Sequence, residues 1–273
     1  MSAAALSLAL GSAVLHATWN ALLASARDVR AATTVALVVS TAVFAPFAVA
    51  TWEVQRAAVP WIVVSAALEL LYFVLLTAAY RRSDLSLVYP IARGSAPVLV
   101  LAGAAVVGAT VGVVQALGVL LVAGGVVLVR GIHGVVDTRG VALSLAIGAA
   151  IAGYTLVDKE GIEHAATLPY LELVLAPVAV AALAAQVAAG GVSSIRAELN
   201  AASVLAGALT FTAYALALAA LELAPAASVA AVRETSVLFA VAIGAYALRE
   251  RVSPSRAAGA ALVVTGIALV AVG

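Results

Sequence analysis

The sequence predicts an all-α membrane protein in which ten transmembrane helices form two inverted five-helix repeats around a central cavity. Three observations lead to this prediction: the composition, the number of apolar segments, and a charged position that recurs in both halves. Of the 273 residues, 65% are apolar and 10% are charged, whereas soluble domains carry about 45–50% apolar and about 25% charged residues. This composition excludes a water-soluble globular fold.

Polar residues, prolines and glycines divide the chain into ten apolar segments. Ten spans of about 20 residues would occupy about 200 positions and leave about 73 for all the connections and both ends. Every connection must therefore be short, and no extramembrane domain fits. The expected spans are residues 3–25, 32–52, 60–80, 85–107, 112–130, 140–158, 168–189, 199–222, 225–248 and 255–272.

The first apolar segment begins so close to the N-terminus that it resembles a secretory signal. A secretory signal has a basic start and a uniformly apolar centre. Here no Lys or Arg precedes Arg27, and His16, Trp19 and Asn20 interrupt the apolar residues. We therefore expect a retained membrane helix.

Residues that suit helix starts precede several later segments. Pro60 and Pro225 stand where a first-turn proline is tolerated. Ser83 or Asp84 precedes the fourth segment, and Ser253 precedes the tenth, where a side-chain oxygen can cap free N–H groups. Because loops favour the same residue types, these positions support the segmentation only when taken together.

Features of the first half recur in the second half. A shift of 140 residues places Arg93 on Arg233, and each arginine lies inside an apolar segment. Internal repetition of this kind is common in transporters. A shift of 141 residues also aligns two pairs of glycines, Gly118 with Gly259 and Gly125 with Gly266.

The repetition predicts a single domain made of two repeats, residues 1–135 and residues 136–273. Each repeat contains five spans, and five is an odd number. The second repeat must therefore enter the membrane from the opposite side, so the repeats are expected to be inverted.

The arginines and lysines of the short connections predict the orientation. Cytoplasmic loops carry an excess of Lys and Arg. One set of connections holds ten arginines, and the opposite set holds Arg56 and Lys159. We therefore expect a multi-pass protein of the cytoplasmic (inner) membrane with both termini outside. The ten arginines are Arg27, Arg30, Arg81, Arg82, Arg130, Arg139, Arg196, Arg249, Arg251 and Arg256.

Arg93 and Arg233 are the strongest candidates for a function. Each lies eight residues into its span, or about 12 Å deep at 1.5 Å per residue, in a hydrocarbon core whose half-thickness is about 15 Å. Arginines at such depth face the bundle interior or a wet cavity. They either offer a guanidinium to a carboxylate or phosphate or hold helices together through Glu69 or Glu234.

Glu69 is the deepest acidic residue in the expected spans. It is either a proton-coupling site or an ion-pair partner. Glu234 adjoins Arg233 but points about 100° away around the helix. One of these two neighbours is therefore expected to face the cavity while the other faces a neighbouring helix.

Polar and aromatic side chains mark the other candidate substrate-binding positions. In the first span, His16 and Asn20 share one helix face with Trp19 alongside. In the sixth span, Tyr154, Asp158 and Lys159 indicate either a cavity end or an interfacial tyrosine beside a local ion pair. Three further tyrosines are either cavity walls for a small organic molecule or packing residues, namely Tyr72, Tyr89 and Tyr214.

Several classes of partner and chemistry are excluded or not indicated. The chain has no Cys, which excludes disulfides and thiolate metal sites. A net charge of +1 indicates no nucleic-acid partner. We expect no metal and no cofactor, and the partners to be a small molecule, the lipid bilayer and protons. The oligomeric state stays open between a monomer and a homodimer.

The sequence resembles the drug/metabolite transporter superfamily, in its ten-span EamA-type branch. The resemblance rests on His16–Asn20, on Tyr80–Pro90 followed by Ala96-Pro97, on Tyr154–Lys159, and on Leu248–Arg251 before Gly259 and Gly266. It implies a bundle of inverted five-helix repeats, a central cavity lined by spans 1, 3, 4, 6, 8 and 9, and alternating access.

Two features depart from the family pattern. Many ten-span relatives are expected to have both termini in the cytoplasm, whereas the loop charges here predict the opposite. The fourth span usually ends in a Gly-Glu pair. This chain has Gly108-Ala109-Thr110 there, and only the second half keeps the acid, as Glu250.

These observations predict a secondary transporter of a small polar metabolite, amino-acid-like or another carboxylate, anionic or zwitterionic. No Gly-x-x-x-x-Gly-Lys loop occurs, so proton coupling or exchange would supply the energy. One alternative is an exporter of lipophilic cations or drugs that uses Glu69 and Glu234. More distant alternatives are an intramembrane enzyme, whose usual motifs are missing, and a scaffold or receptor.

Overall fold

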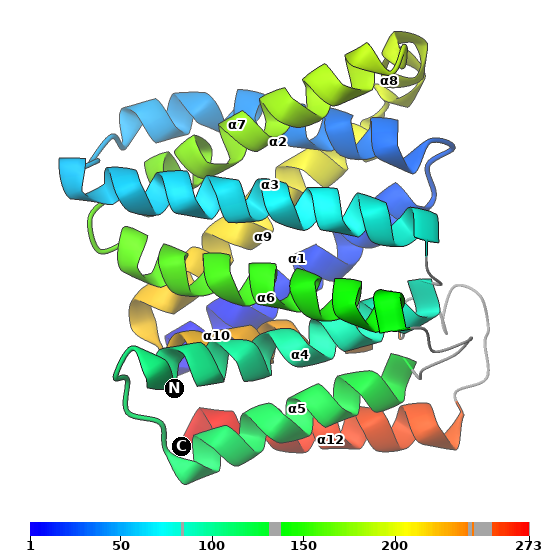
Figure 1. Ribbon diagram of the computed structural model, residues 1–273. Helices are drawn as coiled ribbons and strands as arrows, with labels where there is room; N and C mark the ends of the chain where they lie inside the picture. The colour runs from blue at the N-terminus through cyan, green and yellow to red at the C-terminus, as the bar shows by residue number, and fades with distance from the viewer. Residues whose placement is uncertain (83–84, 131–137, 240–241, 243–252, 273) are drawn as a thin grey trace.

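The computed structural model is a bundle of long helices that run back and forth between two ends (Figure 1). It describes residues 1–82, 85–130, 138–239, 242 and 253–272. Within these ranges the regular elements are helices, and the sole β contact is an isolated bridge between Val54 and Ala165. The prediction of an all-α fold is confirmed.

The helices fall where the apolar segments predict them. Apart from the ninth span and the short helices η1 and α8, every helix end lies within three residues of its expected position. The elements are α1 Ala3–Ala24, α2 Val29–Ala50, η1 Arg56–Ala58, α3 Val59–Arg82, α4 Leu85–Val106, α5 Val113–Arg130, α6 Thr138–Gly161, α7 Thr167–Ala188, α8 Val192–Glu198, α9 Ala201–Leu223, α10 Ala226–Arg233 and α12 Pro254–Val272.

The bundle has the dimensions and the surface of a multi-pass membrane protein. Among the described helices, seven are long and apolar enough to cross a membrane, and Ile91–Val106 and Val113–Val129 are shorter apolar helices. Large apolar side chains such as Phe47, Val63 and Val180 are exposed on the outside. A water-soluble monomer rarely exposes so much apolar surface, but lipid tails accept it.

The ninth span differs from the expected continuous helix. Helix α10 ends at Arg233, a turn occupies residues 234–235, and helical structure resumes at residues 236–239. Here Glu234 N–H donates to Ala231 O at 3.2 Å and Thr235 N–H to Val232 O at 3.0 Å. These bonds reach back three residues instead of four. The Thr235 hydroxyl also donates to Val232 O, a local competition that disfavours regular α-helix.

A second difference is α8, a short helix in the connection between α7 and α9 that apolar periodicity does not reveal. It places Glu198 where its Oε1 accepts the backbone N–H of Asp28 at 3.0 Å. At the opposite end, Gln55 N–H donates to His164 O at 3.0 Å and Ala166 N–H to Glu53 O at 2.8 Å. At both ends, therefore, hydrogen bonds link the first half of the chain to the second.

Helices α5 and α12 pack closely through four glycines. A Cβ added at Gly118 would lie 2.7 Å from Gly266 O, and one added at Gly125 would lie 2.7 Å from Gly259 O. Side chains at these positions would therefore collide with backbone. Small residues allow this kind of approach in membranes, although the small-residue pattern in the sequence has almost no specificity.

We predict that Gly125→Ala destabilises the protein by about 1–3 kcal/mol, the usual cost of overpacking. Its new methyl group would lie 2.9 Å from Val263 N as well as against Gly259 O. Gly124→Ala is the matched control, because a Cβ there meets nothing within 4 Å. Denaturant unfolding in detergent micelles measures both variants. Equal stability of the two would contradict the glycine contact.

Six helices meet around the middle of the bundle. Helix α1 packs against α9 and α10, and α6 packs against α3 and α4. Helix α10 also contacts α4, which brings the two arginine-bearing helices together. These six helices correspond to expected spans 1, 3, 4, 6, 8 and 9.

Candidate functional site

Arg93 on α4 lies between two partners from other helices. Its Nη1 is 3.4 Å from Glu234 Oε1, and the two side chains are 12% and 4% exposed. Its Nη2 is 2.7 Å from His16 Nε2. A guanidinium has donors only, so His16 must accept this hydrogen bond through an unprotonated Nε2. The His16 ring is therefore neutral, and the Arg93 charge is balanced by Glu234.

Arg233 is placed differently, although it follows the same sequence pattern. Its guanidinium carbon lies 5.9 Å from the centre of the Tyr214 ring on α9, a cation–π distance. No carboxylate in the described ranges forms an ion pair with it. It is half-buried and interacts electrostatically with Glu69, Asp158 and His16. Arg233 thus keeps donors available for another anion.

Asp158 on α6 is held by hydroxyl groups from three other helices. Its Oδ1 accepts from Ser65 Oγ at 2.5 Å and from Tyr170 Oη at 2.9 Å, while its Oδ2 accepts from Tyr214 Oη at 2.6 Å. The side chain is 1% exposed. These donors are neutral, so the carboxyl is well hydrogen-bonded without a cation in contact.

Glu69 lies one helical turn beyond Ser65 on α3, so both face the same side of the helix. It is 5% exposed, and its carboxyl interacts with the Tyr214 hydroxyl and with Asp158. The Tyr214 hydroxyl donates to Asp158 and interacts with the Glu69 carboxyl. Glu69 is not the ion-pair partner of Arg93, because Glu234 occupies that position.

The aromatic candidates line this group of charges. The Tyr154 ring centre lies 6.4 Å from that of Tyr72 and 6.1 Å from that of Tyr214. The three rings thus connect α3, α6 and α9. Tyr89 lies in α4, but its side chain is outside the part of the structure that is described.

The remaining candidates lie at the edges of the central group. The Trp19 ring meets His16 edge-on at 4.9 Å, and Asn20 Nδ2 donates to His16 O at 2.7 Å. Lys159 Nζ donates to Leu221 O at 2.5 Å, near the C-terminal end of α9. The expected alternative of an ion pair between Lys159 and Asp158 is therefore not formed. A role for Lys159 in substrate binding stays a prediction.

Three features of the site were missed by the sequence reasoning. Ser65 and Tyr170 complete the hydrogen bonding of Asp158, but nothing in their local sequence distinguishes them. The break after α10 is the third. Next to it, the Ser236 hydroxyl is buried and has no hydrogen-bond partner within the described ranges. The polar run Arg233–Ser236 inside an apolar segment is the signal that could have indicated the break, since discontinuous helices surround many transporter sites.

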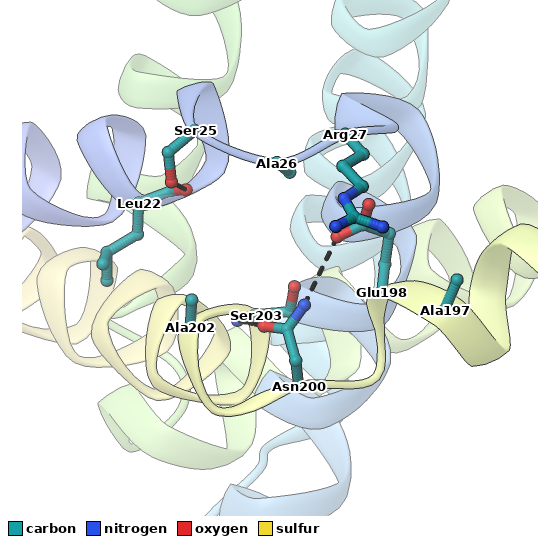
Figure 2. A pocket seen from close by; sticks show the side chains of 9 residues that line it. All are labelled: Leu22, Ser25, Ala26, Arg27, Ala197, Glu198, Asn200, Ala202 and Ser203. Carbon is teal, nitrogen blue, oxygen red and sulfur yellow. Dashed lines mark hydrogen bonds between the residues drawn. The ribbon is translucent and has the colours of Figure 1, made fainter.

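A separate hollow of about 420 Å³ lies at one end of the bundle, between the end of α1 and the start of α9 (Figure 2). Arg27, Glu198 and Asn200 are among its lining residues. Figure 2 shows Asn200 directed at Glu198, and Asn200 Nδ2 donates to Glu198 Oε2 at 3.4 Å. None of the side chains predicted to bind substrate lines this hollow.

Two comparisons with known proteins found similarities, one to a family and one to a fold. Residues 138–272 match the EamA-like transporter family. Of 28 solved chains with significant similarity, one crystal structure has a TM-score of 0.79 and 15% identity, with 100% of this chain and 98% of that chain covered. At this identity the likeness shows the fold alone. No curated protein matches the sequence significantly.

Proposed function

Because residues 138–272 belong to the EamA-like transporter family of the drug/metabolite transporter superfamily, we propose that the chain is a secondary transporter of a small carboxylate-bearing metabolite. The family consists of membrane transporters, not enzymes. The proposed cargo is amino-acid-like or another small carboxylate, and the proposed mechanism is alternating access driven by protons or by exchange.

The proposed architecture is that of two inverted repeats, residues 1–135 and 136–273, around a central binding site. The contacts of α5 with α12 support it. The sequence repeat equates Gly118 with Gly259 and Gly125 with Gly266, while the contacts join Gly118 to Gly266 and Gly125 to Gly259. A pseudo-two-fold axis between the two helices would produce this crossed pattern.

The observation that carries the proposed function is the placement of Arg233. It projects from the end of α10 at a helix break, lies over an aromatic ring and forms no ion pair with the described carboxylates. A guanidinium in this position can receive a carboxylate through two parallel hydrogen bonds. Arg93 is committed to Glu234, which makes Arg233 the main anion-binding residue.

A zwitterion fits the surroundings of Arg233 better than a simple anion does. Glu69 and Asp158 interact with this arginine without touching it. A carboxylate at Arg233 would leave these acidic groups available for an ammonium group of the same molecule. Tyr72, Tyr154 and Tyr214 would then flank its carbon skeleton.

The same acidic residues would also suit a second function, the export of lipophilic cations. An exporter of lipophilic cations would bind its cargo through Glu69, which is buried and outside any ion pair with the described basic groups. Glu234 is less suited to this role because Arg93 holds it. In that case Arg233 would serve only to balance charge.

The proposed orientation places both termini outside the cytoplasm. In Figure 1 the connections α2–α3, α4–α5, α6–α7 and α9–α10 lie at one end, and the connections α1–α2 and α7–α9 lie at the other. Arg27, Arg30 and Arg196 belong to the second end. The positive-inside rule assigns that end to the cytoplasm.

A counterflow experiment tests the proposed function. Purified protein in liposomes, preloaded with an unlabelled amino acid, is expected to accumulate the same labelled amino acid, with a panel of small amino acids and carboxylates used in turn. The corresponding amines, which lack a carboxylate, are the matched control and are expected not to exchange. Binding by the folded protein should also raise its melting temperature in micelles.

The outcomes separate the two functions. Exchange of the carboxylates without the amines supports the anion site at Arg233. Exchange of lipophilic amines or cationic dyes without the carboxylates would contradict the proposal and favour the cation exporter.

A further inference from the structure

The hollow between the end of α1 and the start of α9 lies where a membrane helix meets the lipid headgroups. Helix α1 has 22 residues, or about 33 Å at 1.5 Å per residue, which is close to the hydrocarbon thickness of about 30 Å. Ser25, Ala26 and Arg27 follow directly after this helix and line the hollow. The hollow is therefore at headgroup level, and neither central arginine lines it.

The rim of the hollow carries a positive charge. Arg27 is exposed, and no ion pair in the described ranges includes it. Figure 2 shows its side chain directed from the α1–α2 connection toward the side on which Glu198 lies. A guanidinium in this position can donate to two oxygens of an anionic group such as a phosphate.

The floor of the hollow contains two buried polar side chains, Glu198 at 4% and Ser203 at 2% exposure. Glu198 Oε1 accepts the N–H of Asp28 at 3.0 Å, but Oε2 has only the long 3.4 Å bond from Asn200 Nδ2. Ser203 donates its backbone N–H to Asn200 Oδ1, while its hydroxyl forms no hydrogen bond to the described residues. Because buried polar atoms normally have partners, this floor favours an occupant that supplies them.

The two charges of the hollow are opposite but do not form an ion pair with each other. A simple anion at Arg27 would leave Glu198 without a cation, and a simple cation at Glu198 would leave Arg27 without an anion. A molecule that carries both an anionic group and an ammonium group would satisfy both residues. The volume of about 420 Å³ lies within the range of about 300–1,000 Å³ that is usual for small-ligand sites.

The surface beside the hollow indicates that the membrane supplies this molecule. Leu199, Val204 and Leu205 flank the lining residues of α9 in sequence and are exposed. Exposed apolar side chains of this size contact lipid in a membrane protein. Arg30 and Arg196 add positive charge at the same end, which attracts phosphate groups.

We propose that this hollow binds a phosphoethanolamine headgroup and that phosphatidylethanolamine of the adjoining leaflet supplies it. The phosphate oxygens accept hydrogen bonds from Arg27, and the ammonium group donates to Glu198 Oε2. The Ser203 hydroxyl lies on the floor beside these groups. This lipid site goes beyond the proposed function, and it depends neither on the cargo nor on the residues of the centre.

A headgroup in this position contacts both halves of the chain. Arg27 belongs to the first half, whereas Glu198 and Ser203 belong to the second. The bond from Asp28 N–H to Glu198 already joins the halves at this end, and the headgroup adds a second connection. A ligand that binds only the folded protein raises its apparent stability, so the lipid is expected to raise the melting temperature.

Thermal unfolding of delipidated protein in micelles, with one defined phospholipid added at a time, tests the site. We expect phosphatidylethanolamine to raise the melting temperature more than phosphatidylcholine or phosphatidylglycerol does at the same mole fraction. Phosphatidylcholine has methyl groups in place of the ammonium N–H donors, and phosphatidylglycerol has no ammonium group. Equal stabilisation by the three lipids would overturn the proposal.

Variants of the hollow locate the effect. Arg27→Gln and Glu198→Gln are each expected to weaken the apparent affinity for phosphatidylethanolamine about tenfold, the effect of losing one charge-assisted hydrogen bond. Arg30→Gln is the matched control, because Arg30 is an exposed arginine at the same end that does not line the hollow. It should keep the full preference for this lipid.

Arg27→Gln is the decisive variant, because Arg27 is exposed and no described ion pair is broken by its loss. In Glu198→Gln the new amide oxygen can still accept the N–H of Asp28, so this variant is also expected to fold. An unchanged preference for phosphatidylethanolamine in Arg27→Gln would overturn the site, because the lipid would then bind elsewhere.

Soluble phosphoethanolamine distinguishes the two sources of the headgroup. We expect it to stabilise the protein far less than the lipid does, because lipid tails concentrate the headgroup at the membrane surface. A stabilisation by phosphoethanolamine that disappears in Arg27→Gln, together with none by phosphatidylethanolamine, would overturn the membrane as the source. The hollow would then bind a soluble metabolite with the same two charges.

Discussion

Arg233→Gln is expected to lower carboxylate transport about 100-fold, because removing one partner of a desolvated charge pair costs about 2–5 kcal/mol. The guanidinium lies over Tyr214 and forms no ion pair with the described carboxylates. Its loss therefore removes the proposed anion partner without breaking a direct ion pair in the described part of the chain. The initial rate of labelled amino-acid uptake, compared at subsaturating concentration, measures the change.

Two further variants sharpen this prediction. Arg233→Lys keeps the charge but loses the planar pair of donors, so we expect partial activity with a raised KM. Arg56→Gln changes an exposed arginine at the end of the bundle and should transport normally. Unchanged carboxylate transport in both Arg233→Gln and Arg93→Gln would rule out anion recognition by the arginines.

The helices and the burial of Arg93 and Arg233 were predictable from sequence for a physical reason. A bilayer requires long apolar helices, so the spans are visible as composition alone. Arginines inside such spans must face the protein interior. These constraints are local or nearly local, which is why Arg93 and Arg233 could be identified without knowing any contact.

The pairing of the charges was not predictable, because it depends on contacts between distant segments. Both Glu69 and Glu234 were candidate ion-pair partners of Arg93. Because α10 packs against α4, Glu234 is the residue that forms the ion pair. Asp158 receives hydroxyls from residues 65, 170 and 214. Tyrosines and serines of this kind are common, and no spacing along the chain identifies the three that converge.

The break after α10 and the close contacts of the glycines were also not predictable from hydropathy or from small-residue patterns. A span remains apolar whether or not three-residue hydrogen bonds interrupt its α-helix, so hydropathy does not report the turn at residues 234–235. Glycine pairs are frequent in a chain rich in Ala and Gly. Their significance comes from the backbone of α12 opposite Gly118 and Gly125, which belongs to the other half of the chain.

Arg93→Gln is expected to lower the free energy of unfolding by about 3–5 kcal/mol, the usual effect of removing one partner of a buried ion pair. Glu234 is 4% exposed and would lose the guanidinium that lies 3.4 Å from its Oε1. Glu234→Gln should destabilise the protein for the converse reason. The double variant should recover much of the loss, because two amides can hydrogen-bond to each other without an unpaired charge. Denaturant unfolding in micelles supplies the four free energies of the cycle.

The transport activity of the double variant then distinguishes the two roles of Arg93. If Arg93 only holds α4 to α10, the stable double variant should retain carboxylate exchange, and Arg233 alone would bind the anion. If the double variant is stable but exchanges no carboxylate, Arg93 also contributes to substrate recognition. The proposal that Arg233 alone binds the anion would then be wrong. Additive destabilisation in the cycle would contradict the ion pair itself, because independent side chains show no coupling free energy.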